Sequence, residues 1–190
     1  MSQLPTTQIR LNHLRKQFLC PESNPDFYSI AKWHLGLHST DYWSPYLSVF
    51  ARSGDYDAEQ MYQALNQGAQ LARIHAFRGA VHIVHQDNLS LILAATGPRL
   101  YRMARKSKSL RTLSDHQVET LLNQFLAALE ETPLRMRELK QALPTLAPMM
   151  RPLLYLGMAT GKVVRAHTPH ARSTLSSYAL MKQRFPTIKH

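Results

Sequence analysis

The sequence contains little cysteine, little acid and no long apolar run. Its single cysteine, Cys20, excludes an internal disulfide and a zinc site built from cysteines. The first twenty residues do not show the basic and then apolar order of a signal peptide. The best apolar run, LSLILAAT at 89–96, is much shorter than the roughly 20 residues that cross a bilayer. We therefore expect a soluble cytoplasmic protein without a membrane segment.

Acidic residues are scarce and unevenly placed. The 190 residues include 12 Asp and Glu against 23 Lys and Arg, which gives a formal net charge of +11. No acidic side chain follows Glu138, and six basic residues occur from Arg99 to Arg111 without an acid. A field of one sign attracts a polyanion. Nucleic acid is favoured over a membrane surface, because no basic amphipathic helix with a strong apolar face is evident. A basic protein without a polyanionic partner is the alternative.

The first half contains helical patterns followed by an alternating one. Periodic apolar residues predict helices over 6–19 and 27–37, and a third helix that Asp57 caps and Gly68 ends. The run LARIHAFRGAVHIVHQD alternates and is rich in β-branched and aromatic residues, so it predicts a β-hairpin over approximately 72–85 with its turn near Gly79. Asp87 is then expected to cap an apolar helix, 88–96, which Gly97-Pro98 ends.

The second half repeats this scheme. Ser114 and Gln117 form a capping box before a strongly amphipathic helix. Thr132-Pro133 predicts the start of a short helix that runs to Leu143, and a further helical segment follows over 147–159. Two strand-like runs, GKVVRA and RSTLSSYALM, are joined by HTPHA and predict a second hairpin.

Three helices followed by a two-stranded wing are the order of a winged-helix unit, whose third helix enters the major groove of DNA. The order is clear over 132–181 and looser over 6–86. We predict a mainly α protein with small β-hairpin wings (α+β), built as tandem winged-helix domains. The first domain would span 1–111 with a connecting helix, and the second 112–190.

One stretch resembles a known family. The runs LGLHSTDYWSPYLSVFARSGDYD and ARIHAFRGAVHIVHQDNL are similar to the winged-helix DNA-binding proteins that include the AlkZ-like bacterial DNA glycosylases. The family pattern is a Leu-Gly stretch, a Gln-x-Gln or related motif beside Asp, an apolar segment ending in Arg, a basic hairpin and an Asp-capped helix. The matching positions are Leu35-Gly36, His38-Ser39-Thr40 with Asp41, Arg52, Arg78-Gly79-Ala80-Val81-His82, and Asp87. LLYLGMATGKVVRA and RSTLSSYAL resemble the second wing.

The resemblance implies tandem winged helices that cradle double-stranded DNA without a metal or organic cofactor. In the glycosylases, the two polar motif residues hold the water that attacks the sugar as the base leaves. His38 and Thr40 would occupy these two places, and Asp41 is a further catalytic candidate. Histidine accepts a hydrogen bond and titrates near neutrality, whereas the threonine hydroxyl is shorter than a glutamine amide. The chain also ends at His190, where the family normally continues into a third domain.

The DNA-binding candidates combine the hairpin with the basic runs. Arg78 and His82 are predicted to share one face of the first hairpin, whereas His82 and His85 lie on opposite faces and form a poor metal pair. The full set of DNA-binding candidates is Arg52, Arg78, His82, Arg99, Arg102, Arg105, Lys106, Lys108, Arg151, Lys162, Arg165, His167, His170 and Arg172.

Purely structural roles stay open for His38 and Asp41. His38 can be a histidine bonded to backbone at a helix end, and Asp41 can cap a helix that begins at Tyr42. Three functions are therefore carried forward. The first is a monofunctional glycosylase that removes alkylated or crosslinked bases, the second is a non-catalytic DNA-binding module, and the third is a basic adaptor for other proteins. A monomer is favoured.

Overall fold

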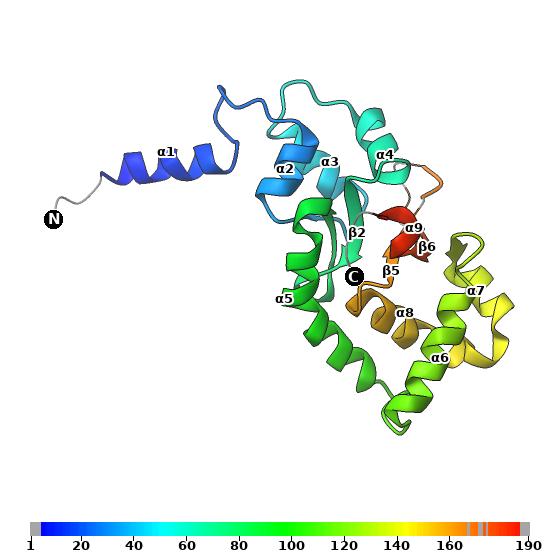
Figure 1. Ribbon diagram of the computed structural model, residues 1–190. Coiled ribbons are helices and arrows are strands. Elements are labelled where there is room, and N and C mark those ends of the chain that lie inside the picture. Colours follow the sequence, from blue (N-terminus) through cyan, green and yellow to red (C-terminus); the bar gives the residue numbers. More distant parts are fainter. Residues whose placement is uncertain (1–4, 167, 171–172, 174, 187–190) are drawn as a thin grey trace.

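An antiparallel sheet of six strands forms the centre of the computed structural model, which describes residues 5–166, 168–170, 173 and 175–186 (Figure 1). The strands are β1 Leu37–His38, β2 Leu71–His75, β3 Val81–His85, β4 Leu134–Arg135, β5 Val163–Arg165 and β6 Ser177–Leu180, in the spatial order β1-β3-β2-β5-β6-β4. The two predicted hairpins are confirmed, because β2 pairs with β3 and β5 pairs with β6.

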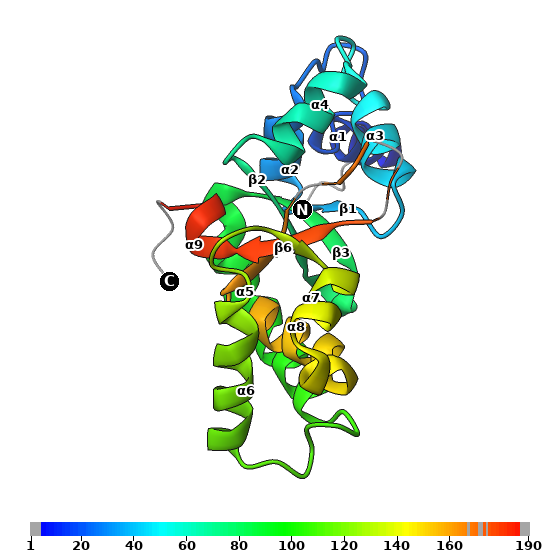
Figure 2. The same ribbon diagram turned by 90° about the vertical axis from the view of Figure 1, so that its right-hand side faces the viewer.

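The helices surround this sheet in two groups. They are α1 Thr6–Lys16, α2 Phe27–Trp33, α3 Trp43–Phe50, α4 Ala58–Asn66, α5 Gln86–Arg105, α6 Asp115–Ala127, α7 Met136–Ala142, α8 Met150–Ala159 and α9 Met181–Arg184, with the short 3₁₀ helices η1 Phe77–Gly79 and η2 Pro144–Met149. Figure 2 shows the strands between an upper group that contains α1–α4 and a lower group that contains α6–α8. The α+β class is therefore confirmed, with a larger sheet than two small wings would give.

Several local predictions hold because side chains satisfy the free N–H groups at helix starts. The Asp57 carboxylate accepts from the backbone N–H of Glu59 at 2.8 Å and so caps α4. Ser114 and Gln117 form the predicted capping box at the start of α6. At the hairpin turn, Gly79 has φ +78°, a backbone conformation that favours glycine.

The two halves of the chain share one sheet and one central core. Strand β2 pairs with β3 on one side and with β5 on the other, where Arg73 lies opposite Arg165. The hydrophobic cluster at this junction includes Ile74 and Ile92 from the first half and Val164 and Phe185 from the second. Burial of these side chains removes apolar surface of both halves from water, so it favours a fixed arrangement of the two.

One predicted helix end is wrong. Helix α5 does not stop at Gly97-Pro98 but continues to Arg105. Gly97 faces α8 so closely that a Cβ would lie 2.5 Å from the carbonyl oxygen of Ala159. Packing against α8 therefore offsets the hydrogen bond that Pro98 removes from the helix. The predicted cap is also wrong, because His85 is the N-cap, and its Nδ1 accepts from the backbone N–H of Asp87.

The start of helix α7 was predicted too early in the sequence. Thr132-Pro133 does not begin a helix, because Leu134 and Arg135 form β4 at the edge of the sheet, opposite β6. Helix α7 begins at Met136, and the Glu138 carboxylate accepts from the backbone N–H of Arg135 at 2.6 Å. The pairing with β6, which is far away in sequence, sets this boundary.

Helix α1 stands away from the rest of the molecule (Figure 1). It has no buried residue, and its apolar side chains Ile9, Leu11 and Leu14 are exposed. A hydrogen bond of 2.6 Å from the indole of Trp33 to the carbonyl oxygen of Lys16 holds the end of the helix. The helix predicted over 6–19 is thus present but ends at Lys16, because Phe18 has a left-handed backbone conformation, with φ +56°.

Candidate active site and nucleic-acid interface

The candidate motif His38-Ser39-Thr40 lies beside the β2–β3 hairpin. His38 on β1 pairs with His82 on β3, and the backbone N–H of Ser39 donates to the carbonyl oxygen of Val81 at 2.8 Å. His38 and Thr40 are exposed, whereas Ser39 between them is buried. This alternation is that of an extended chain, so the two candidate side chains face the same side. His38 is therefore not the histidine at a helix end that was one sequence interpretation.

Three aromatic rings meet at this hairpin. The ring centroids of His38 and His82 are 5.6 Å apart in an edge-to-face arrangement, and those of Phe77 and His82 are 5.2 Å apart. Phe77 is 39% exposed. Rings of this kind at an open surface can stack on nucleobases. The hairpin thus brings the two imidazole rings of His38 and His82 and the exposed ring of Phe77 to one place.

The His82 ring is held in one orientation. Its Nδ1 lies 3.0 Å from the carbonyl oxygen of Ala80. Because a carbonyl only accepts, Nδ1 carries the proton in the neutral ring and Nε2 is left as an acceptor. Burial lowers the pKa of His82, and the neighbouring His38 lowers it further, while the Ala80 carbonyl opposes both effects. The ring is therefore neutral at pH 7.

Thr40 and Asp41 each have a structural role as well. The Thr40 hydroxyl oxygen accepts from the backbone N–H of Val81 at 3.3 Å. The Asp41 carboxylate accepts from the backbone N–H groups of Trp43 and Ser44 at 3.0 and 2.7 Å and from the Ser44 hydroxyl at 2.6 Å. Hydrogen bonds from Ser44 lower the pKa of Asp41. Asp41 is thus ionised and holds the first turn of α3, which begins at Trp43, one residue later than expected.

Arg78 lies at the exposed tip of the hairpin, within the turn η1. It has a left-handed backbone conformation, with φ +55°. The prediction that Arg78 shares a strand face with His82 is wrong, because the turn separates them. Both residues nevertheless belong to the same hairpin tip, which presents the Arg78 guanidinium to solvent.

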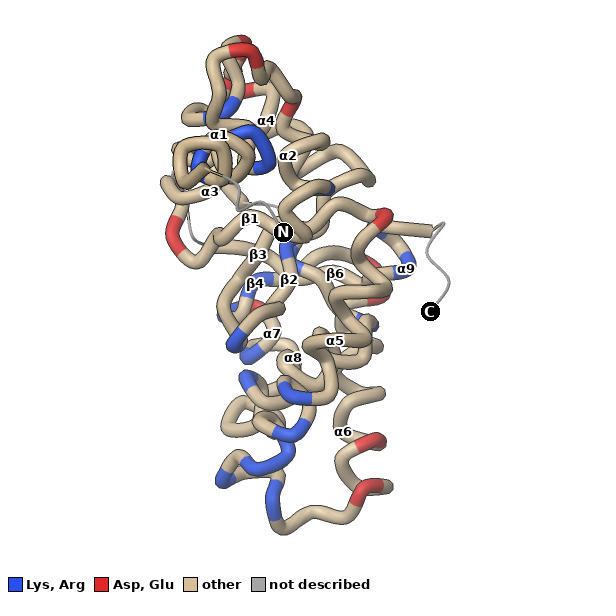
Figure 3. The backbone as a smooth tube through the Cα atoms, turned by 90° about the vertical axis from the view of Figure 1, so that its left-hand side faces the viewer, with Lys and Arg blue, Asp and Glu red and all other residues tan. Residues whose placement is uncertain are grey.

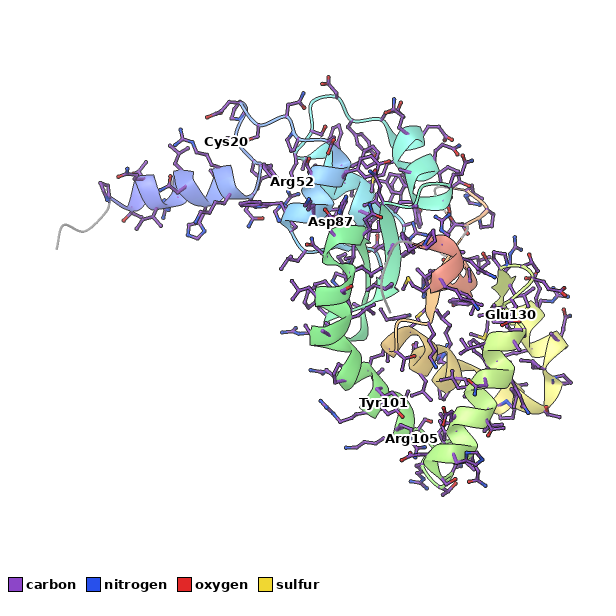
Figure 4. The ribbon with its side chains drawn as sticks, viewed as in Figure 1. Cys20, Arg52, Asp87, Tyr101, Arg105 and Glu130 are labelled. Atoms are coloured by element: carbon purple, nitrogen blue, oxygen red, sulfur yellow. The ribbon has the colours of Figure 1, made fainter. Side chains whose placement is uncertain are left out.

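The basic run at 99–111 divides into exposed and engaged residues. Arg99, Arg102, Lys106 and Lys108 are exposed, and Figure 3 shows basic positions gathered where α5 ends, with acidic positions on α6 at the opposite edge. Arg105 instead donates to the carbonyl oxygens of Leu110 and Leu113 and to the Asp115 carboxylate, where the chain turns towards α6 (Figure 4). Its guanidinium already has three acceptors within the protein.

Arg52 is likewise hydrogen-bonded to acceptors within the protein. Its guanidinium donates to the carbonyl oxygen of Gln17 at 2.9 Å, and to the carbonyl oxygen and hydroxyl of Ser48 (Figure 4). It therefore ties the segment after α1 to α3. Lys162 and His170 are exposed. His167 and Arg172 lie outside the described residues.

Arg151 and Arg165 come together in a cavity that the sequence did not indicate as a unit. Lys140 and His75 line it too, although neither was a sequence candidate. Lys140 belongs to the acid-free stretch after Glu138, which was a usable signal. His75 is brought there only by the pairing of β2 with β5. Strands β2 and β5 thus place Arg73 of the first half opposite Arg165 of the second half.

The described residues hold no cluster of three or more histidine, cysteine or acidic side chains that could bind a metal ion. In the same part of the chain, no helix has both the length and the apolar character needed to cross a membrane.

Comparison with known proteins identifies the fold. Residues 31–189 match the family model described as DNA glycosylase AlkZ-like. The structure of Streptomyces sahachiroi DNA glycosylase AlkZ superposes with a TM-score of 0.73 at 18% sequence identity. The match covers 98% of this chain and 52% of that chain, so the chain spans about half the length of the solved relative. No curated protein matches the sequence.

Proposed function

Because the chain belongs to the AlkZ-like DNA glycosylase family, we propose that it binds double-stranded DNA and hydrolyses the N-glycosidic bond of an alkylated or crosslinked base. Binding would use two winged-helix units, residues 1–111 and 112–190, whose hairpins are β2–β3 and β5–β6. The observation that carries the proposal is the pairing of β1 with β3, which presents His38 and Thr40 together beside an exposed hairpin tip with Phe77 and Arg78.

The chemistry needs an acceptor near the sugar carbon. As the base leaves, this carbon becomes cation-like, and a water must attack it. An imidazole nitrogen of His38 can accept a hydrogen bond from that water. The Thr40 hydroxyl oxygen accepts from Val81, so its own proton remains available for donation to a second oxygen. The ionised Asp41 carboxylate adds negative charge at the same loop, which favours the developing positive charge.

An excision assay tests this proposal. The protein is incubated with duplex DNA that carries an alkylated base, and abasic sites are measured. Excision should fall at least about 100-fold in His38→Ala, the usual effect of losing a positioned proton acceptor, while duplex affinity changes little. His116→Ala is the matched control, because His116 is exposed on α6 and is not a site candidate. Equal excision by wild type and His38→Ala would remove His38 from the mechanism.

A non-catalytic DNA-binding module is the second candidate. The favouring observation is that Asp41 is committed to the start of α3 and that Thr40 bonds to backbone, so the loop has a complete structural role without a water. In this case the wild-type protein would bind duplex DNA with a steep salt dependence but release no base from any alkylated substrate. An adaptor for other proteins would instead show no salt-sensitive duplex binding.

A further inference from the structure

A basic cavity lies where α7, η2 and α8 face the strands β2, β5 and β6. Its volume is about 400 Å³, and three cationic side chains line it, Lys140, Arg151 and Arg165. His75, Tyr155 and Tyr178 contribute rings to its wall. No carboxylate of the described residues lines this cavity. Its charge is therefore of one sign, which is the composition of a site for an anion.

Arg165 has a second cation beside it. Arg73 lies opposite Arg165 in the β2–β5 pair. The Nε atoms of both guanidinium groups are buried and have no hydrogen-bond partner among the described residues. The residues outside that description include no Asp or Glu, so they cannot supply a side-chain carboxylate. Two adjacent, partly buried guanidinium groups with unpaired Nε donors are costly for the folded state.

Burial lowers the pKa of Arg73 to about 10; the neighbouring Arg165 lowers it too, whereas Tyr46 opposes the shift. Arg73 is therefore still charged at pH 7, and the repulsion between the two arginines persists in the free protein. A bound anion would relieve it. Guanidinium groups suit this task, because their planar N–H donors match two oxygens of a phosphate at once.

Arg165 also connects this cavity to the candidate motif. It lines a second, smaller hollow together with Arg73, and the wall of that hollow includes Ser39, Thr40 and Asp41. One side chain therefore borders both the basic cavity and the loop that would position the water. An anion held by Arg165 would lie next to that loop.

We propose that the cavity bounded by Lys140, Arg151 and Arg165 is a phosphate subsite, which receives a backbone phosphate of the DNA strand beside the nucleotide presented to His38 and Thr40. The inference rests on the proposed DNA function. It identifies a backbone phosphate as the part of the substrate that is recognised where β2 of the first half meets β5 of the second half. Tyr155, which is partly exposed, provides a ring against which the attached sugar or a neighbouring base can pack. The buried Tyr178 ring instead lies under the Arg165 guanidinium, 6.0 Å from the ring centroid, and helps to position it.

The first experiment needs no DNA. The melting temperature is measured in inorganic phosphate and in chloride at equal ionic strength and pH. With phosphate at roughly ten times its Kd, the wild-type protein should melt about 3–6 °C higher. Arg165→Gln and Arg151→Gln should lose most of this difference, and Arg10→Gln, on the exposed helix α1, should keep it. Arg151 is exposed, so its variant reports on the cavity even if Arg165→Gln folds poorly.

The second experiment identifies the source of the phosphate. Single phosphates around the target nucleotide of a duplex are replaced in turn by neutral methylphosphonate. One position should weaken wild-type binding about tenfold, the size of a lost charge-assisted contact, and the same replacement should have no effect on Arg165→Gln. Equal losses in both proteins, or a phosphate shift without any sensitive position in DNA, would overturn the proposal.

The two proposals fail in different ways. If inorganic phosphate raises the melting temperature through Arg165 but the protein does not bind duplex DNA, the proposed function fails and the cavity holds free phosphate instead. If the protein binds and cleaves its substrate but shows no phosphate-specific shift, the glycosylase function stands and the phosphate subsite is refuted.

Discussion

Replacing Gly97 by alanine tests the packing that joins the two halves. Gly97 lies within α5, where a Cβ would approach the carbonyl oxygen of Ala159 on α8 to 2.5 Å. Carbon and oxygen atoms of neighbouring groups normally stay at least about 3.3 Å apart. Because the obstacle is backbone, it cannot rotate away as a side chain could. The two helices must therefore separate or slide.

The magnitude follows from two opposing effects. Overpacking of this kind typically costs about 1–3 kcal/mol, and a backbone obstacle favours the upper part of that range. Alanine in place of glycine contributes about 1 kcal/mol of helix stability in the opposite direction. We therefore expect a net loss of about 1–2 kcal/mol in the free energy of unfolding. For a chain of 190 residues, the melting temperature should fall by roughly 2–8 °C.

Urea unfolding followed by circular dichroism measures this change, with the midpoint compared at an unchanged m-value. Ser90→Ala is the matched control, since Ser90 is exposed on the same helix. It should gain up to about 0.5 kcal/mol from helix propensity alone. A Gly97→Ala variant as stable as wild type, or more stable, would refute the close packing of α5 against α8 at Gly97.

Three further predictions concern charge. Arg105→Ala should lower the free energy of unfolding by about 2–3 kcal/mol, because it leaves two carbonyls and the Asp115 carboxylate without their donor. In the same urea assay, the control Lys106→Ala should change this free energy by less than about 0.5 kcal/mol. His75 is one of three histidines in the described ranges whose pKa is lowered mainly by burial. The contribution of these histidines to stability should thus be complete above the ordinary histidine pKa of about 6.5. It should fall as the pH drops below that value, because the unfolded chain takes up protons first. His75→Gln should flatten this pH profile of stability, and an unchanged profile would show that the His75 ring does not cause it. Arg151→Gln should reduce the slope of log binding constant against log salt by about 0.9 in a fluorescence titration with duplex DNA, if Arg151 contacts one phosphate.

The sequence predicted the elements whose signals are local. The capping box at Ser114, the cap at Asp57 and the alternating run around Gly79 each lie within a few neighbouring residues, and all three are present. Local physical chemistry decides such features, because a helix N–H or a turn can be satisfied by side chains one to three residues away.

The features that were not predicted depend on distant partners. Nothing near Arg73 indicates that its strand will pair with the strand of Arg165, yet that pairing joins the two hairpins. The same holds for Gly97, whose role is visible only once α8 lies against it. The basic cavity is non-local for this reason, since its cations come from α7, α8 and β5.

Positive charge in this chain therefore has two separate uses, which composition alone cannot distinguish. Arg52 and Arg105 are bonded to acceptors inside the protein, so they stabilise the fold and have little donor capacity left for DNA. Arg73 and Arg165 have buried donors without partners in the described structure, which destabilises the free protein. A buried donor without a partner is uncommon in native structures, and the proposed phosphate would supply one. The partly buried pair Arg73 and Arg165, where β2 meets β5, is thus the feature on which the proposed phosphate site rests, rather than the larger exposed basic run.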